Sequence, residues 1–478
     1  MSSYHNLPIV SRRFRLVSSS FLQGDGLHFA AALPEARIQE AFDAESVDFA
    51  QDDDDVYTPA VTLWASLSQV LHKGEQRSCL AAVARVLVLL VALGRKPCAK
   101  NSGAYCRARA KVSEVVLRRL TTEVARGCEN AVPDRWLWHN RHVLAADGTT
   151  ASMPDTQPNQ HEYPQHVAQK PGLGFPIVRL VVLLSLATAM VHSMALGPYA
   201  GKETGETALF RQLLAGVDPQ TIFLADRYYC SYFLLAMALF GQRDFVVRLH
   251  QCRKIELSKT QRLGTDDHTV VWTRPARPDW MEQADYEQIP ESMSLRLIKV
   301  QVQDPGFRVE TLWVVTTLTD TRKYPREDIA DLYRRRWMAE LDIRAIKKTM
   351  GMDVLRCKSP ARVRQEIWTC LLAYNLIRKT LLEAAYETDL SPRELSFTTA
   401  MQTIAASIGM LAGANEELAA KLIAAQISSL IEQIVGDRPN RVEPRAVKRR
   451  WKPIALLTKP RNEARAELLR GAPAKRSA

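Results

Sequence analysis

The sequence has no paired cysteines and no long uninterrupted apolar run, and each absence excludes a class of protein. Its eight cysteines are far apart, without a CxxC pair or the Cys/His spacing of a zinc module, in a chain of 478 residues that needs no disulfides for stability. The apolar runs 80–93 and 177–196 contain Arg85 and Arg179, so neither predicts a membrane span. The N-terminus also lacks a signal-peptide core. We therefore expect a reduced, cytoplasmic protein.

The positive charge of the chain is concentrated at its C-terminus. The whole chain has a formal net charge of +12, and residues 438–478 hold 13 Lys and Arg residues against three Glu. The rest of the chain is therefore close to neutral. A basic tail that is interrupted by prolines and contains Trp451 is suited to follow a phosphate backbone, but a solvated terminus has the same composition.

The N-terminal third contains an acidic segment followed by helical patterns. Residues 43–55 hold seven acids, four of them consecutive, which predicts an exposed linker because adjacent carboxylates repel one another. Residues 62–126 have helical periodicity, with Leu63, Leu67 and Leu71 on one stripe. Within them, residues 94–111 carry six Lys and Arg residues around two glycines and a proline. This segment fits either a basic turn that contacts DNA or a solvated connection.

The central region predicts a mixed sheet with helices on its faces. Apolar, β-branched runs alternate with helical patterns in the order βββαβαβ, which is typical of an α/β fold. Residues 250–315 then show only strand and turn patterns, and one long helix is predicted over 326–350. The predicted segments of the sheet are strands 143–147, 177–184, 190–196, 221–226 and 245–249, with helices 206–214 and 229–240.

Two aspartates follow apolar strand patterns in matching contexts. Asp147 ends the pattern VLAAD and precedes Gly148, while Asp226 ends TIFLAD and precedes Arg227. Functional sites of open α/β sheets lie at the carboxyl ends of strands. An aspartate at such a position can equally be a helix N-cap or a turn former.

A third acid lies in the predicted helix 326–350. At about 100° per residue, Tyr333, Arg336, Glu340 and Lys347 fall within an arc of about 60°. Glu340 is the one acidic residue among these four, and the four together form a polar stripe on the helix. By itself, the stripe fits an ordinary salt-bridged surface as well as a functional face.

The intervals of this stripe match Y-x2-R-x3-E-x6-K, and LAADGT and FLADRYYCSYF surround the two aspartates. Together these features resemble the signature of a large group of bacterial insertion-sequence DDE transposases, over roughly residues 143–378. The resemblance implies a ribonuclease H-like core with an all-β insertion that corresponds to residues 250–315. The expected parts are an N-terminal arm and linker (1–57), a helical DNA-end-binding region (58–135), the catalytic core (136–249 and 316–390) with its insertion (250–315), C-terminal helices (391–437) and the basic tail (438–478).

The resemblance also implies a chemistry. Asp147, Asp226 and Glu340 would bind two Mg²⁺ ions, for which Mn²⁺ is a substitute, during phosphodiester hydrolysis and strand transfer. The residue types fit, because Mg²⁺ prefers hard oxygen ligands. The candidate DNA contacts on the same helical face, or next to the second aspartate, are Tyr333, Arg336, Lys347 and Arg227.

Related cut-and-paste transposases stack an extruded base on a tryptophan of the β insertion. Trp313 is at the corresponding position, Trp272 is the weaker candidate, and a buried core aromatic is the alternative for either.

The leading hypothesis is a DNA transposase that binds the terminal inverted repeats of an insertion sequence, cuts and rejoins the DNA, and acts as a homodimer in the synaptic complex. Two alternatives remain: a non-catalytic DNA-binding derivative, and a nuclease of the same fold without strand transfer.

Overall fold

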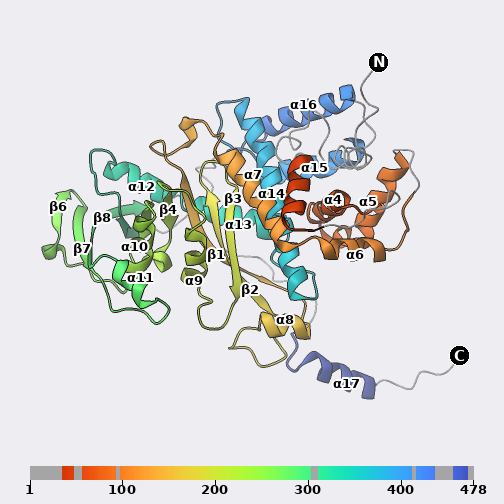
Figure 1. Ribbon diagram of the computed structural model, residues 1–478, viewed down its shortest axis with the longest axis horizontal. Coiled ribbons are helices and arrows are strands. Elements are labelled where there is room, and N and C mark those ends of the chain that lie inside the picture. The colour runs from red at the N-terminus through yellow and green to blue at the C-terminus, as the bar shows by residue number, and fades with distance from the viewer. Residues whose placement is uncertain are drawn as a thin grey trace, which may run out of the picture.

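A nine-stranded sheet forms the centre of the protein. The computed structural model describes residues 35–47, 56–92, 97–302, 310–411, 416–435 and 456–471 (Figure 1). The strand order in the sheet is β3-β2-β1-β4-β5-β9-β8-β7-β6. The strands are β1 (Val143–Ser152), β2 (Ile177–Ser185), β3 (Val191–Pro198), β4 (Ile222–Ala225), β5 (Asp244–Arg248), β6 (Gln261–Gly264), β7 (Asp267–Thr273), β8 (Ser292–Val302) and β9 (Glu310–Thr316).

Apart from the six-residue helix α8 (Gln157–Glu162) between β1 and β2, the first five strands follow the predicted order βββαβαβ and confirm the ribonuclease H-like α/β fold. Strands β1, β2 and β3 are antiparallel neighbours, whereas β4 and β5 continue the sheet parallel to β1. Both faces are covered, so alternate residues of one strand enter different cores. Leu144 and Ala146 pack with α9 (Glu206–Leu214) and α10 (Tyr232–Phe240), while Val143 and Ala145 face α14 (Pro360–Tyr386).

The insertion extends the central sheet rather than forming a separate layer. Strand β9 pairs antiparallel with β5, and β8, β7 and β6 follow outward. Figure 1 shows β6, β7 and β8, in green, at the end of the molecule opposite the helices α4, α5 and α6. The expectation of strands alone is wrong in one detail, because the insertion also contains helix α11 (Gln283–Gln288). Six residues are too few to display a 3.6-residue period.

The N-terminal helices are α3 (Glu35–Ala44), α4 (Pro59–Val70), α5 (Cys79–Ala92), α6 (Gly103–Lys111) and α7 (Glu114–Glu129). Of these, α4 and α7 pack against α14, and the others pack on these two. The buried Arg77 guanidinium, between α4 and α5, donates hydrogen bonds to the carbonyls of Met350 and Gly351. The apolar run 80–93 corresponds to α5. In the part of the chain that is described, no helix is long and apolar enough to span a bilayer.

The predicted helix 326–350 is not one regular helix. It consists of α12 (Arg326–Arg334), α13 (Trp337–Arg344) and the π-helical turn η5 (Ala345–Thr349). At the junction, the N–H groups of Arg336 and Met338 bond three residues back, to the carbonyls of Tyr333 and Arg335. Hydrogen bonds of this kind form a 3₁₀ turn, in which each residue rotates about 120° around the helix axis, more than in an α-helix. In a π turn each residue rotates less than in an α-helix. The stripe predicted from a constant 100° is therefore distorted.

The remaining helices are α15 (Phe397–Leu411), α16 (Glu416–Glu432) and α17 (Arg461–Gly471). Helix α17 belongs to the basic tail and is exposed along most of its length. The rest of the predicted tail, residues 438–455 and 472–478, and residues 48–55 of the acidic linker lie outside the described residues.

Candidate active site

Strand register brings the two predicted aspartates together. Strand β1 pairs with β4 in parallel, with Ala146 opposite Ala225. Asp147 and Asp226 directly follow these two alanines, so they are neighbours across the two strands. Asp147 does not end its strand, however. Strand β1 continues to Ser152 because its antiparallel pairing with β2 persists beyond the point where β4 ends. Asp147 therefore lies inside β1, at the step where its parallel neighbour stops.

Asp226 combines a candidate functional position with a local structural role. Its Oδ1 accepts a 2.7 Å hydrogen bond from the N–H of Tyr228, and it caps the short helix η3 (Arg227–Tyr229). Arg227 donates a hydrogen bond of 2.8 Å to the side-chain oxygen of Gln251. The N-cap interpretation of Asp226 is correct, and the other carboxylate oxygen has no part in that cap.

Asp147 is the most strongly perturbed carboxyl group at this edge. Its pKa is raised to about 6, chiefly by burial. Arg336 and the Gly148 N–H act in the opposite direction, while the Glu340 and Glu206 carboxylates add to the increase. A carboxylate in such surroundings is stabilised by any cation that binds beside it.

Glu340, on helix α13, lies within electrostatic range of Asp147. Glu340 forms an ion pair with Arg336 at 2.8 Å, and both groups interact electrostatically with Asp147. Tyr333 is 5% exposed, and its pKa is raised to about 12, chiefly by burial, with Arg336 and Arg248 opposing the increase. Of the four stripe residues, Tyr333, Arg336 and Glu340 therefore lie together.

Lys347 lies apart from this group. It belongs to the π turn, and burial lowers its pKa. The charged groups that act on it are Asp353 and Lys348. Glu340 is not among these groups, and it precedes Lys347 by about two helical turns.

Trp313 lies on β9 near the same edge of the sheet. Its carbonyl accepts a hydrogen bond from the N–H of Leu249, the residue after β5. The indole is half-buried and lies edge-on to the His268 ring at a centroid distance of 6.1 Å. It is therefore in part the core aromatic that the sequence allowed as an alternative.

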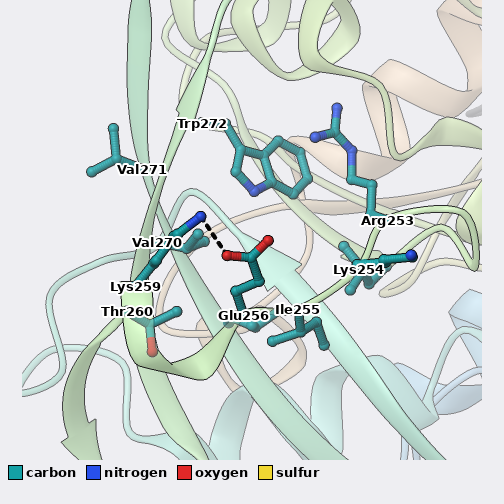
Figure 2. A pocket seen from close by; sticks show the side chains of 11 residues that line it. Arg253, Lys254, Ile255, Glu256, Lys259, Thr260, Val270, Val271 and Trp272 are labelled. Atoms are coloured by element: carbon teal, nitrogen blue, oxygen red, sulfur yellow. Dashed lines mark ion pairs between the residues drawn. The ribbon is translucent and has the colours of Figure 1, made fainter.

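Trp272 lines an open pocket of about 360 Å³ beside the loop that follows β5 (Figure 2). The Arg253 guanidinium lies 3.8 Å from the centre of its ring. The other charged groups of the lining are Lys254, Lys259 and Glu256, of which the last two form an ion pair. The sequence patterns gave no indication of this basic pocket, which the segments 249–260 and 270–272 form together with Leu297.

A buried charge network holds the helix that carries Glu340. Asp342, also on α13, is 2% exposed and accepts hydrogen bonds of 2.7 Å from Arg378 and from Arg393. Arg378 belongs to α14, and Arg393 also donates to the carbonyls of Ser185 and Leu186 beside the β2–β3 hairpin. Sequence periodicity alone did not distinguish Asp342 from a surface acid.

The sequence patterns do not single out a fourth acid, Glu206, because an acid in the first turn of a helix is common. Glu206 begins α9 and interacts electrostatically with Asp147 and Asp226. Its pKa is raised, chiefly by burial and then by Asp226.

The residues at this edge fit a divalent metal ion in donor type and charge. They offer carboxylate oxygens, the ligands that Mg²⁺ prefers, and the buried Asp147 is surrounded by further acids. Among the described residues, no three or more His, Cys, Asp or Glu side chains are close enough together to hold a metal ion. Glu340 is turned to Arg336 in this arrangement, so it would have to leave that ion pair to join the aspartates.

Known proteins resemble this chain over the region that contains the site. Residues 138–376 match the family described as "Transposase DDE domain". "Transposase InsG for insertion sequence element IS4" of Escherichia coli (strain K12) is 30% identical over 370 residues, which cover 75% of this chain and 79% of the relative. "Putative transposase InsZ" of the same organism is 29% identical over 136 residues, 28% of this chain and 44% of the relative. Among solved structures, a piggyBac transposase synaptic complex with hairpin DNA aligns with 91% of this chain and 86% of its own, at 11% identity and a TM-score of 0.40.

Proposed function

The chain belongs to the DDE transposases of the IS4 family, and we propose that it cuts and joins DNA at the ends of an insertion sequence with Asp147, Asp226 and Glu340 as its metal-binding carboxylates. The main support for these residues is the register of β1 against β4, which makes the two aspartates neighbours. The electrostatic interaction of Glu340 with Asp147 supports the third.

DDE transposases use divalent metal ions, and we propose two Mg²⁺ ions here, with Mn²⁺ as a substitute. Bound at these carboxylates, the ions would activate the attacking oxygen and stabilise the leaving oxygen of an in-line displacement at phosphorus. The chain itself would supply Asp147 and Asp226 from a rigid sheet and Glu340 from α13.

Cationic groups beside the carboxylates would hold the DNA backbone. Arg336 suits bidentate contact with a phosphate and would exchange its partner Glu340 for that phosphate. Tyr333 and Arg227 lie at the same edge, and Lys347 would contact the backbone further along η5. The proposed partners are the double-stranded transposon ends and target DNA, bound by a homodimer in the cytoplasm, with the basic tail as an additional DNA contact.

Strand transfer is the reaction that tests this function. The purified chain, Mg²⁺ and DNA carrying the element's inverted repeats are expected to yield free 3′ hydroxyl ends and then products joined to a target plasmid. Cleavage without joined products would support a nuclease of the same fold instead. Binding to the ends without any cleavage would support a non-catalytic derivative, which the presence of all three acids disfavours.

The two tryptophans of the insertion provide a second test. We expect Trp313→Ala to leave first-strand nicking unchanged and to slow second-strand cleavage about tenfold, because stacking of a base on an aromatic ring contributes about 1–3 kcal/mol. The measurement is the time course of both products on labelled transposon ends. Trp272→Ala is the matched variant, since that ring lines the pocket shown in Figure 2. If Trp272→Ala alone slows the second step, the stacking role belongs to Trp272, and normal kinetics in both variants would remove the role altogether.

A further inference from the structure

Gly148 leaves space in β1 for a carboxyl group from another element. Side chains alternate along a strand, so Asp147 and Gly148 face opposite sides of the sheet. Gly148 shares its side with Leu144 and Ala146, which pack toward α9 and α10. A Cβ atom at this position would overlap the carboxyl group of Glu206. Gly148 is not among the glycines with a positive φ, so it is the lack of a side chain that matters here.

Glu206 contacts both segments that carry the catalytic aspartates. Besides lying over Gly148 in β1, its Oε2 is 3.4 Å from the hydroxyl of Tyr229, which is fully buried in the turn after Asp226. Tyr229 can donate this hydrogen bond to the carboxylate. Within the described residues Glu206 takes part in no ion pair with Lys or Arg at 4 Å or less, in contrast to Glu340 with Arg336.

We infer that Glu206 is a fourth carboxylate of the metal site, which lies on the α9 side of β1, within electrostatic range of Asp147 and Asp226, and strengthens the binding of the divalent ion that they hold. The inference rests on the proposed function of those two residues. Mg²⁺ usually keeps several water ligands, so the Glu206 carboxylate can act either directly or through a bound water. Loss of such a supporting group typically weakens metal binding 10- to 100-fold.

Titration of the full-length chain with Mn²⁺, followed by electron paramagnetic resonance of the free ion, tests this role without using activity. Glu206→Gln keeps the shape of the side chain and removes its charge, and we expect it to weaken Mn²⁺ binding at least tenfold. Glu203→Gln is the matched control, because Glu203 lies in the same loop but is exposed and paired with Arg211. It should bind Mn²⁺ as the unmodified chain does.

Gly148→Ala provides an independent variant, because it displaces the Glu206 carboxyl group while all four acids remain. It too should weaken Mn²⁺ binding, and thermal unfolding of each variant verifies that it is folded. A Glu206→Gln titration that superimposes on that of Glu203→Gln would overturn the inference.

Asp147→Asn separates this result from a failure of the proposed function. If Asp147→Asn abolishes Mn²⁺ binding and Glu206→Gln does not alter it, the proposed site stands and only the role of Glu206 is wrong. If Asp147→Asn itself leaves Mn²⁺ binding unchanged, the assignment of the catalytic carboxylates fails.

Discussion

Replacement of Asp147 by asparagine is expected to abolish DNA cleavage and strand transfer while binding to the transposon ends persists. The amide has the shape of the carboxylate but not its charge, so the variant loses a metal ligand at the centre of the proposed site. Metal ions supply several kcal/mol of transition-state stabilisation, which corresponds to a rate loss of at least about 10³-fold. Asp226→Asn and Glu340→Gln should cause losses of similar size, because the three groups act as one unit.

Cleavage of labelled transposon ends and electrophoretic retardation of the same DNA measure the two properties separately. Binding should be unchanged or slightly tighter, because each variant removes a negative charge that repels phosphates. Asp155→Asn is the matched control, since Asp155 is an exposed carboxylate shortly after β1. Full cleavage by all three triad variants would show that the active-site assignment is wrong.

The pairing of the two aspartates could be predicted because each follows a short apolar strand. What the patterns could not provide was the register and the length of β1. The continuous apolar run ends before Asp147, whereas the strand continues to Ser152 through half-buried residues among which only Ala151 is buried. Hydrogen bonds to β2 hold this second half. Periodicity detects burial, and a half-buried stretch that is held by pairing with a neighbouring strand gives little such signal.

Of the predicted stripe, Tyr333, Arg336 and Glu340 interact with one another in the structure, whereas Lys347 belongs to the π turn η5, where the charged groups acting on it are Asp353 and Lys348. A constant angle per residue is accurate over two turns and accumulates error across a tightened junction and a π turn. The N–H of Met350 bonds five residues back, to the carbonyl of Ala345. Such local changes arise from tertiary packing, which no single-sequence pattern contains.

Glu206 and Asp342 illustrate the same limit in the site itself. One is an acid at a helix start and the other an acid on an amphipathic helix, and both contexts are common on protein surfaces. Their partners come from other segments of the chain. Glu206 contacts Tyr229, and Asp342 contacts Arg378 and Arg393. The folded structure alone distinguishes these two acids from ordinary surface carboxylates.

Asp342→Ala is expected to be the most destabilising single substitution near the site. The variant would leave Arg378, which is 5% exposed, and Arg393 without the carboxylate that both of them contact. Removal of one partner from a buried ion pair typically costs about 3–5 kcal/mol. At roughly 2–4 °C per kcal/mol for a large domain, the Tm should fall by about 10 °C.

Thermal unfolding followed by circular dichroism measures this change, with Asp331→Ala as the matched control. Asp331 forms an exposed ion pair with Arg334 on the preceding helix α12, and such pairs contribute about 0–1 kcal/mol. Its Tm should therefore stay within about 2 °C of the unmodified chain. Equal Tm values for the two variants would contradict the structural role of Asp342. Since α13 carries both Asp342 and Glu340, a destabilised network should also lower cleavage at temperatures where the chain remains folded, because Glu340 would no longer be held toward Asp147.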